Sequence, residues 1–372
     1  MPSLRAEQVG SLLRPADLLA ARAARADGRL DPSALRAKED EAIRAAVARQ
    51  RDIGLDVLCD GEMRRYSWLT GMADAVDGFL SDSVMLEWHG PGGGREQTTA
   101  KIVGARLRKR EMLTANEVPF MKSLLQERSA RRQPSVFKVT IPAPSNFVPT
   151  GFKPGVTDRF YRDRDALLAD LVAIVRDEIQ WLIAQGVTYI QLDAPFYSHY
   201  LDPAHRKAMQ MSGTNPDAEF ESAVAGDNAT FAGLERPGVT MAVHICRGNS
   251  RSRWYTEGGY DAIAGKLFAR LDVDRFLLEY DTGRSGTFEP LRLVPRGKDV
   301  VLGLITTKEP ALERADDLRR RIDEAARFMP LENLALSPQC GFASIAAGNL
   351  LSMDDQWTKL ELVVDVARKT WE

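Results

Sequence analysis

Four residues carry side chains that together could bind a metal ion. His244 and Cys246 stand two positions apart in the segment VHIC, so on a strand both would point to the same side. Glu279 lies in the apolar run FLLEY, and Cys340 follows the run LALSP. Imidazole, thiolate and carboxylate are the usual donors to zinc. An H-x-C pair alone is weak evidence, but the set of four predicts one zinc ion per chain. Cys59 has no histidine nearby and is expected to be a buried structural residue.

The elements that must bring these residues together repeat as short β-rich runs followed by longer helical patterns. The expected helices are Pro32–Gly54, Asp163–Gln185, Pro310–Met329 and Met353–Lys369. The expected strands are Glu7–Ser11, Val57–Glu62, Val136–Pro142, Tyr189–Ala194, Val239–Cys246, Arg275–Tyr280, Val300–Thr306 and Leu334–Ser337. Several runs are almost continuously apolar, as in a parallel sheet covered on both faces. Eight strands alternating with helices predict an α/β fold, a (β/α)8 TIM barrel.

Two stretches interrupt this alternation. Residues 81–116, after the second strand, contain HGPGGG and KIVGARLRKR and are expected to form an insertion, as a hairpin. Residues 198–237, after the fourth strand, are polar and rich in glycine and proline, and suit a lid or a helical excursion. Neither stretch is long enough to predict a second domain. We therefore expect residues 1–372 to form one barrel domain with insertions after strands 2 and 4.

Composition excludes several classes of protein. The 372 residues include 50 Lys and Arg against 52 Asp and Glu, and this balance gives no support to a nucleic-acid partner. No apolar run is long enough to span a membrane, and the first residues do not resemble a secretory signal. Three cysteines cannot form a disulfide framework. A soluble, cytoplasmic protein is expected, and a homo-oligomer remains open.

The motifs, taken together, resemble the cobalamin-independent methionine synthase family, specifically its C-terminal catalytic barrel and its short bacterial relatives. They are VGSLLRP (9–15), DVLCDGE (56–62), IQLDAP (190–195), VHICRGN (243–249), LEYDTGRSG (278–286) and SPQCG (337–341). The resemblance covers most of the chain. It implies a zinc site made by His244, Cys246, Glu279 and Cys340.

The resemblance also implies a pocket for a thiol substrate, formed by Ser11, Glu62 and Asp193. Glu62 and Asp193 are the candidate catalytic carboxylates, and as neighbouring strand-end carboxylates they would suit a substrate ammonium group. Either could instead cap a helix or pair with an arginine. Ser11 could bind a substrate carboxylate, or it could be an ordinary helix N-cap.

The chain departs from the family pattern at three places. An aspartate–glutamate pair after the fourth strand is here Asp193-Ala194, and IPAPSNF replaces a tryptophan-bearing segment that helps to hold the folate donor. Thr306-Thr307-Lys308 stands where the full-length enzymes carry a histidine after the seventh strand, and the role of Lys308 is open. These changes leave methyl-folate as only one candidate for the methyl donor.

The leading hypothesis is a zinc-dependent methyltransferase that activates a thiol, homocysteine, as a zinc thiolate and converts it to methionine. A related zinc enzyme could instead use coenzyme M with an epoxide, or take its methyl group from a methylcobamide. Coenzyme M carries a sulfonate, which would need a positively charged partner such as Arg247, Arg253 or Lys308. A metal-free barrel resembling the uroporphyrinogen decarboxylases and a non-catalytic zinc protein are the alternatives from other classes.

Overall fold

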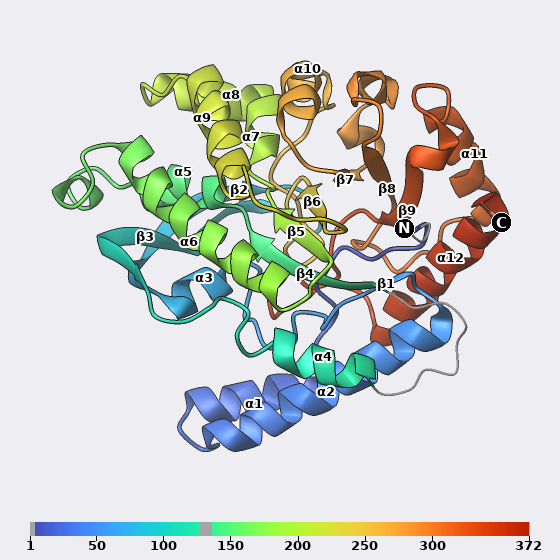
Figure 1. Cartoon of the computed structure of the whole chain (residues 1–372), viewed down its shortest axis with the longest axis horizontal. Coiled ribbons are helices and arrows are strands. Elements are labelled where there is room, and N and C mark those ends of the chain that lie inside the picture. Colours follow the sequence, from blue (N-terminus) through green and yellow to red (C-terminus); the bar gives the residue numbers. More distant parts are fainter. Residues whose placement is uncertain (1–3, 127–135, 372) are drawn as a thin grey trace.

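A curled parallel sheet forms the centre of the molecule. The computed structural model describes residues 4–126 and 136–371. The sheet has the order β1-β4-β5-β6-β7-β8-β9, and every neighbouring pair in it is parallel. Its strands are β1 (Val57–Leu58), β4 (Val136–Pro142), β5 (Tyr189–Asp193), β6 (Thr240–Ile245), β7 (Arg275–Glu279), β8 (Asp299–Ile305) and β9 (Leu334–Pro338). Figure 1 shows these strands at the centre, with helices around the outside. The fold is that of a TIM barrel, as predicted.

The expected first strand, Glu7–Ser11, is wrong. Only Ala6 makes a parallel bridge, to Leu336 of β9, while the carbonyl of Ala6 accepts the N–H of Asp56 just before β1. The carbonyl groups of residues 8–10 then accept hydrogen bonds from the side chains of Lys138, Gln191 and Cys59, in that order. Because side chains occupy these acceptors, no strand ladder continues there. The short bridge still connects the two ends of the sheet.

Helices cover the outer face of the sheet, and several match the expected segments. The long ones are α2 (Pro32–Ile53), α6 (Arg164–Ala184), α11 (Ala315–Ala325) and α12 (Met353–Trp371). The others are α1 (Ala16–Ala26), α3 (Thr70–Ala75), α4 (Val118–Gln126), α5 (Val148–Gly151), α7 (Tyr197–Leu201), α8 (Pro203–Met211), α9 (Pro216–Ala229) and α10 (Asp261–Arg270). The helix expected from Pro310 begins only at Ala315, after Arg314 in an extended conformation, and the Glu313 side chain before it accepts the backbone N–H of Thr306. Within the described residues, no helix has the length and apolar character needed to cross a membrane.

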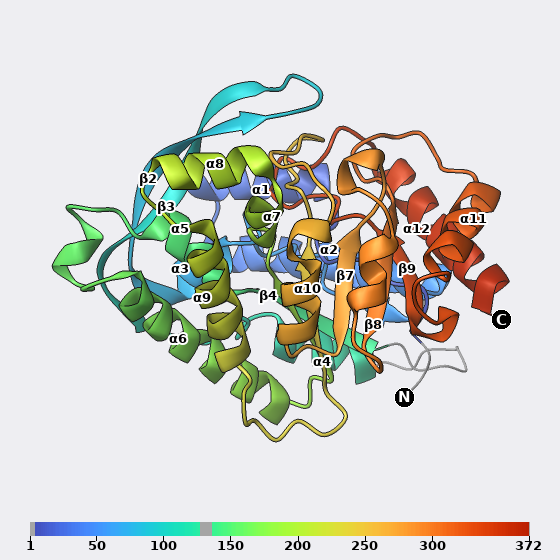
Figure 2. The same cartoon turned by 90° about the horizontal axis from the view of Figure 1, so that it is seen from above.

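The two predicted insertions are present at the predicted places. Between β1 and β4 the chain forms a long antiparallel hairpin, β2 (Val76–Trp88) with β3 (Gly94–Lys109), which begins five residues earlier than expected. Between β5 and β6 it forms α7, α8 and α9. Figure 2 shows the hairpin projecting from the body of the molecule. Both insertions therefore follow strand ends, where a barrel carries its functional groups.

Alternating residues on each strand point into the barrel. One residue from each of β1, β5, β6, β7, β8 and β9 joins Val9 in a small inner cluster, made of Val9, Val57, Tyr189, Ala242, Leu277, Val301 and Ala335. Because side chains alternate with a period of two, Gln191 and Asp193 follow Tyr189 on the inner face of β5, and His244 follows Ala242 on β6. The residues nearer the carboxyl ends of these strands are polar and buried. The candidate site therefore lies at the end of the barrel interior.

Candidate metal centre and substrate cavity

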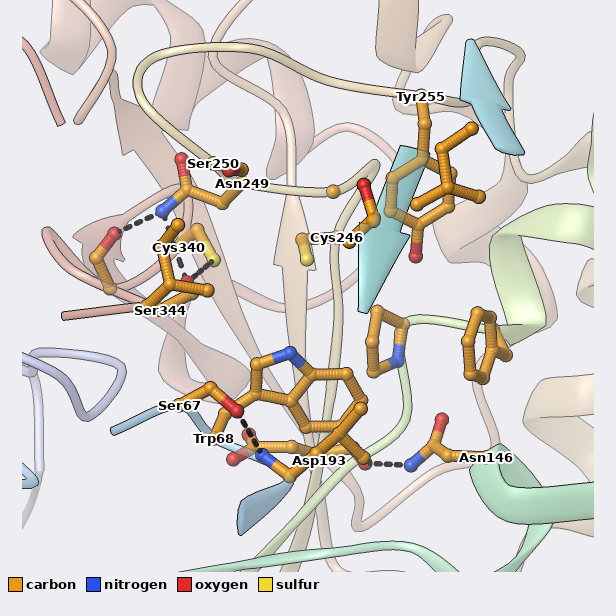
Figure 3. A pocket seen from close by; sticks show the side chains of 18 of the residues that line it. Ser67, Trp68, Asn146, Asp193, Cys246, Asn249, Ser250, Tyr255, Cys340 and Ser344 are labelled. Carbon is orange, nitrogen blue, oxygen red and sulfur yellow. Dashed lines mark hydrogen bonds between the residues drawn. The ribbon is translucent and has the colours of Figure 1, made fainter. Parts of the chain in front are cut away.

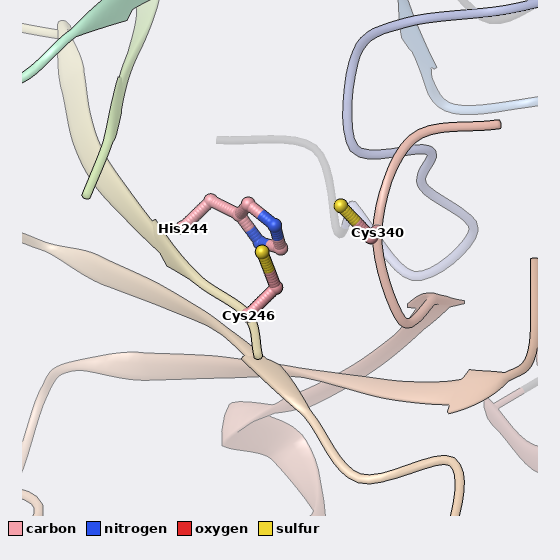
Figure 4. Close-up of side chains that lie close together, drawn as sticks. All are labelled: His244, Cys246 and Cys340. Carbon is pink, nitrogen blue, oxygen red and sulfur yellow. The ribbon is translucent and has the colours of Figure 1, made fainter. Parts of the chain in front are cut away.

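Three of the four predicted zinc ligands meet in the structure. His244 is on β6, Cys246 comes directly after β6, and Cys340 comes shortly after β9. One ligand atom from each lies within 4.8 Å of the others, and all three residues are buried (Figure 4). The three cysteines of the chain are free thiols, so no disulfide competes for these sulfur atoms. Cys59 lies elsewhere, donating its thiol to the carbonyl of Gly10, as expected of a structural residue.

The chemistry of this group fits a zinc ion. Both ring nitrogens of His244 are buried and have no hydrogen-bond partner among the described residues. Buried polar atoms without a partner are costly, and metal coordination would satisfy one of these nitrogens. Hydrogen bonding from the Cys246 thiol, with the charges of His244 and Lys308, lowers the pKa of Cys340 well below its ordinary value in spite of burial. The thiolate, which is the form that binds zinc, is therefore favoured at Cys340.

The structure does not bring Glu279 into this group of three. Its carboxylate is fully buried, with one oxygen accepting from Arg284 Nε at 2.8 Å and the other from the Arg247 backbone N–H at 2.8 Å. Arg284 also holds both oxygens of Asp281 at 2.8 Å. Although burial would raise the pKa of Glu279, the charges of Arg284, Lys308 and Arg247 hold it below its ordinary value. Glu279 is thus a charged carboxylate oriented by arginine, and its role as a ligand stays a prediction.

The predicted pocket residues line one cavity together with the candidate metal-binding group, which is His244, Cys246 and Cys340. The cavity has a volume of about 560 Å³, and its walls include Ser11, Glu62 and Asp193 as well as His244, Cys246 and Cys340. Figure 3 shows Asp193, Cys246 and Cys340 around this space. Asp193 is the direct neighbour of His244 across the β5–β6 pair. A molecule in this cavity could therefore contact the carboxylates and the three candidate metal ligands at the same time.

Glu62 and Asp193 are held in place by neighbouring polar groups. Thr140 donates its hydroxyl to Glu62 Oε1 at 3.1 Å, while Glu62 Oε2 is buried without a partner in the described structure. Glu62 has a φ of 55°, a strained value for a residue with a side chain, and such strain is typical of functional sites. Gln191 donates to Asp193 Oδ1 at 2.7 Å. Burial and the nearby charge of Glu62 raise the pKa of Asp193 to about 7.

Ser11 sits against the loop that carries Cys340. The backbone N–H of Phe342 donates to the carbonyl of Ser11 at 2.8 Å. A Cβ atom on Gly341 would lie 2.0 Å from the Ser11 hydroxyl oxygen, so a larger residue there would have to displace this hydroxyl. Ser11 is therefore not a helix N-cap: α1 begins at Ala16, and Pro15 is the residue before it. Its buried hydroxyl lies in the cavity wall.

Several cavity residues were not anticipated from the sequence. Trp68, from the segment after β1, and Tyr255, from the segment after β6, both line the cavity, and so does the inner face of the hairpin from Val84 to Lys101. The hairpin is attached to the segment after β6 by backbone pairing of His89 with Trp254. The turn residues of a hairpin can be recognised in the sequence. The sequence of the hairpin does not show which part of the molecule the hairpin packs against.

The three basic residues considered for a sulfonate do not form an anion pocket. Arg247 and Lys308 are buried but are not among the residues lining the cavity. Arg253 does line it, but its Nη1 donates to Glu96 Oε2 at 2.5 Å and its guanidinium stacks over the Trp88 ring at 5.0 Å. Of these three residues, the one that lines the cavity is therefore already paired with a carboxylate, while Lys101 and Arg251 also contribute to the cavity wall.

The chain matches known proteins over almost its whole length. Residues 4–369 match the family model described as the catalytic domain of cobalamin-independent synthase. The chain belongs to this family. The Bacillus subtilis member YxjH, an uncharacterised protein, is 37% identical over 99% of this chain and 94% of its own. A methionine synthase of Pyrococcus abyssi is 23% identical over 92% of this chain and 87% of its own.

A solved structure supports the same assignment to the cobalamin-independent synthase family. The crystal structure named as a putative vitamin-B12 independent methionine synthase from Listeria monocytogenes is 26% identical, with a TM-score of 0.72 over 99% of this chain and 98% of that one. Membership in the family establishes a methionine-synthase-like enzyme fold for this chain. It leaves the substrate, the donor and the metal to be proposed from the site itself.

Proposed function

We propose that this protein is a zinc-dependent S-methyltransferase that methylates homocysteine to methionine, with one zinc ion per chain. The observation that carries the proposal is that the carboxylates Glu62 and Asp193 share one cavity with His244, Cys246 and Cys340. An amino-acid thiol has an ammonium group for the carboxylates and a sulfur atom for the metal. Family membership and the methionine synthase relatives support the same reaction class.

The first requirement of this reaction is a bound zinc ion. His244, Cys246 and Cys340 would hold zinc, with Glu279 as the predicted fourth ligand. Zinc bound there would act as a Lewis acid that lowers the pKa of a coordinating thiol.

The cavity walls would set the position of the substrate. Glu62 and Asp193 would bind the ammonium group, and the Ser11 hydroxyl would bind the carboxylate. Trp68 and Tyr255 would exclude water from the sulfur atom. The substrate sulfur then attacks the methyl carbon of the donor, and the new carbon–sulfur bond forms as the bond from methyl to donor breaks.

The alternatives fit the cavity less well. A coenzyme M transferase needs a cation for the sulfonate. Arg253 is paired with Glu96, Arg247 and Lys308 do not line the cavity, and the cavity residues Lys101 and Arg251 belong to the hairpin and to the segment after β6, not to the strand ends that carry His244 and Asp193. A metal-free decarboxylase leaves the two unpartnered nitrogens of His244 unexplained.

The test is a thiol screen with product analysis by mass spectrometry. Zinc-loaded protein is incubated with homocysteine, coenzyme M or a simple alkanethiol, each with methyl-folate, a methylcobamide or an epoxide. Methionine formed from homocysteine with a methyl donor, and no product after zinc removal, is the expected result. A thioether formed from coenzyme M but none from homocysteine would overturn the proposal.

A further inference from the structure

Lys308 is buried near Cys340 and does not line the substrate cavity. It follows β8, its side chain is buried, and it is absent from the cavity wall. Its Nζ donates to the carbonyl of Gly248 at 2.9 Å, to Asn249 Oδ1 at 2.9 Å and to the carbonyl of Arg253 at 3.3 Å. An ammonium group has three protons, so all of them are engaged. Lys308 therefore has no proton left to donate to a substrate.

The segment held by Lys308 is one that needs external support. It begins two residues after Cys246 and contains Gly248, with a φ of 93°, and Arg251 and Ser252, with φ values of 52° and 66°. Left-handed conformations at residues with side chains are strained and persist only when the surroundings stabilise them. Lys308 supplies three of the contacts that stabilise this segment, because it bridges its beginning, at Gly248, to Arg253.

Asn249 links the segment after Cys246 to the loop that carries Cys340. Its side-chain Nδ2 donates to the carbonyl of Gly341 at 2.7 Å and to Ser344 Oγ at 3.1 Å, while its Oδ1 accepts from Lys308. Gly341 is adjacent to Cys340, and Ser344 Oγ lies 3.7 Å from Cys340 Sγ. Figure 3 shows Asn249, Ser344 and Cys340 grouped together beside the cavity. One buried ammonium group is thus linked to the segments that carry both cysteines.

We propose that Lys308 is a positioning residue that sets the separation of Cys246 and Cys340 and so determines how tightly the site binds metal. The inference rests on the proposed zinc site. The positive charge of Lys308 also offsets part of the negative charge at Cys340. Lys308 would then affect metal binding through the segments that carry Cys246 and Cys340, without contacting the metal or the substrate. Outer residues that orient metal ligands typically change metal affinity by about 10- to 100-fold when they are replaced.

The experiment measures zinc affinity by competition with a chromophoric chelator, at a temperature where every variant is folded by circular dichroism. Lys308→Met, which removes the charge and three hydrogen bonds, should bind zinc at least about tenfold more weakly than the parent chain. Cobalt(II) bound in place of zinc should show altered visible absorption bands in this variant, since these bands report ligand geometry.

Lys138→Met is the matched control. Lys138 is also a buried lysine that donates to a carboxylate and a backbone carbonyl, but it lies among residues of the other end of the barrel. This variant should lose stability and keep the zinc affinity of the parent chain. A merely structural Lys308 would behave in the same way, and that result would overturn the inference.

Lys308→Arg keeps the charge and provides a second test if Lys308→Met does not fold. A planar guanidinium cannot direct its protons to the same three acceptors, so zinc binding should remain weaker than in the parent chain. Full affinity in Lys308→Arg would refute the positioning role. A parent chain that binds no zinc at all would instead contradict the proposed function.

Discussion

At the scale of single residues, the cavity holds two carboxylates, Glu62 and Asp193, that have too little positive charge beside them. One oxygen of Glu62 is buried without a partner in the described structure, and burial together with Glu62 raises the pKa of Asp193 to about 7. Arg65 approaches Glu62 only to 4.0 Å, because its guanidinium is engaged by Glu117 at 2.6 Å. A substrate ammonium group would supply the missing positive charge.

Replacing either carboxylate should therefore weaken an amino-acid thiol. Asp193→Asn and Glu62→Gln are each expected to weaken homocysteine binding at least about tenfold, since removing one charge from a buried, hydrogen-bonded pair typically costs about 2–5 kcal/mol. Titration calorimetry with homocysteine, and with an alkanethiol that lacks the amine, measures the effect. Zinc content should not change. If the parent chain binds homocysteine no better than the alkanethiol, the amino-acid pocket is refuted.

The raised pKa of Asp193 also predicts a pH dependence. Above a pH of about 7 the carboxyl group is charged and can bind an ammonium group, whereas below this pH it is protonated. The preference for homocysteine over the alkanethiol should therefore grow as the pH rises through about 7. Taking the ratio of the two affinities removes the ionisation of the thiol, which both ligands share. In Asp193→Asn this ratio should change little with pH, and an unchanged slope would contradict the assignment.

The cysteines provide a direct test of the metal site. Cys246→Ser and Cys340→Ser should each lose most of the zinc, because a neutral hydroxyl is a poor replacement for a thiolate ligand. Cys59→Ser is the control, since Cys59 is an equally buried free thiol outside the group of three. Zinc is measured by elemental analysis of protein purified without chelator. Loss of zinc from Cys59→Ser and its retention in Cys340→Ser would show that the ligands are assigned wrongly.

At the scale of elements, the β2–β3 hairpin changes the chemistry of the cavity. Its inner face lines the cavity, and its Glu96 forms an ion pair with Arg253 from the segment after β6. The same arginine stacks over Trp88 at the end of β2. The hairpin therefore both encloses the substrate space and neutralises a cation that could otherwise bind an anionic thiol.

Breaking this ion pair should alter selectivity. In Glu96→Gln, Arg253 keeps its place over Trp88 but loses its carboxylate partner, so a sulfonate thiol such as coenzyme M should bind more tightly than it binds to the parent chain. The change in stability should stay below about 1 kcal/mol, because the Glu96 side chain is 46% exposed. Asp82→Asn removes another ion pair of the hairpin, with Lys153, outside the cavity, and serves as the control. Equal coenzyme M affinities in both variants would contradict this role of Glu96.

At the scale of the whole molecule, a buried ionic cluster stabilises the closure of the barrel. Lys138 Nζ and Glu7 Oε1 are 2.8 Å apart, and both side chains are fully buried. Glu7 also accepts from the Tyr189 hydroxyl at 2.7 Å and lies 3.3 Å from Arg275. Although burial would raise the pKa of Glu7, the charges of Lys138 and Arg275 hold it below its ordinary value. Glu7 follows Ala6, whose bridge to β9 connects the two ends of the sheet.

Removing one member of this cluster should destabilise the fold and leave the affinity for zinc unchanged. Lys138→Met leaves a buried charge without its closest partner, and the expected loss is about 3–5 kcal/mol in the free energy of unfolding. Because the lowered pKa of Glu7 stabilises the fold at neutral pH, stability should fall as the pH decreases through the acidic range. Urea unfolding at several pH values measures both effects. A loss below about 1 kcal/mol would show that the cluster does not hold the barrel closed.

Sequence patterns predicted the barrel class, the strands from β4 to β9, the two insertions, and His244, Cys246 and Cys340 as candidate metal ligands that the fold brings together. These features are local: apolar runs and a period of two report which face of a strand is buried, and parallel strands carry their ends to one rim.

The contacts of each buried polar group could be learned only from the packed chain. Glu279 accepts hydrogen bonds from Arg284 and Arg247, Arg253 is paired with Glu96, and Lys308 supports the segment after β6. These pairings join residues from different elements, and the spacing of residues along one element carries no information about its partners in another. The physical reason is that a buried charge takes whichever partner the packed chain brings within hydrogen-bonding distance.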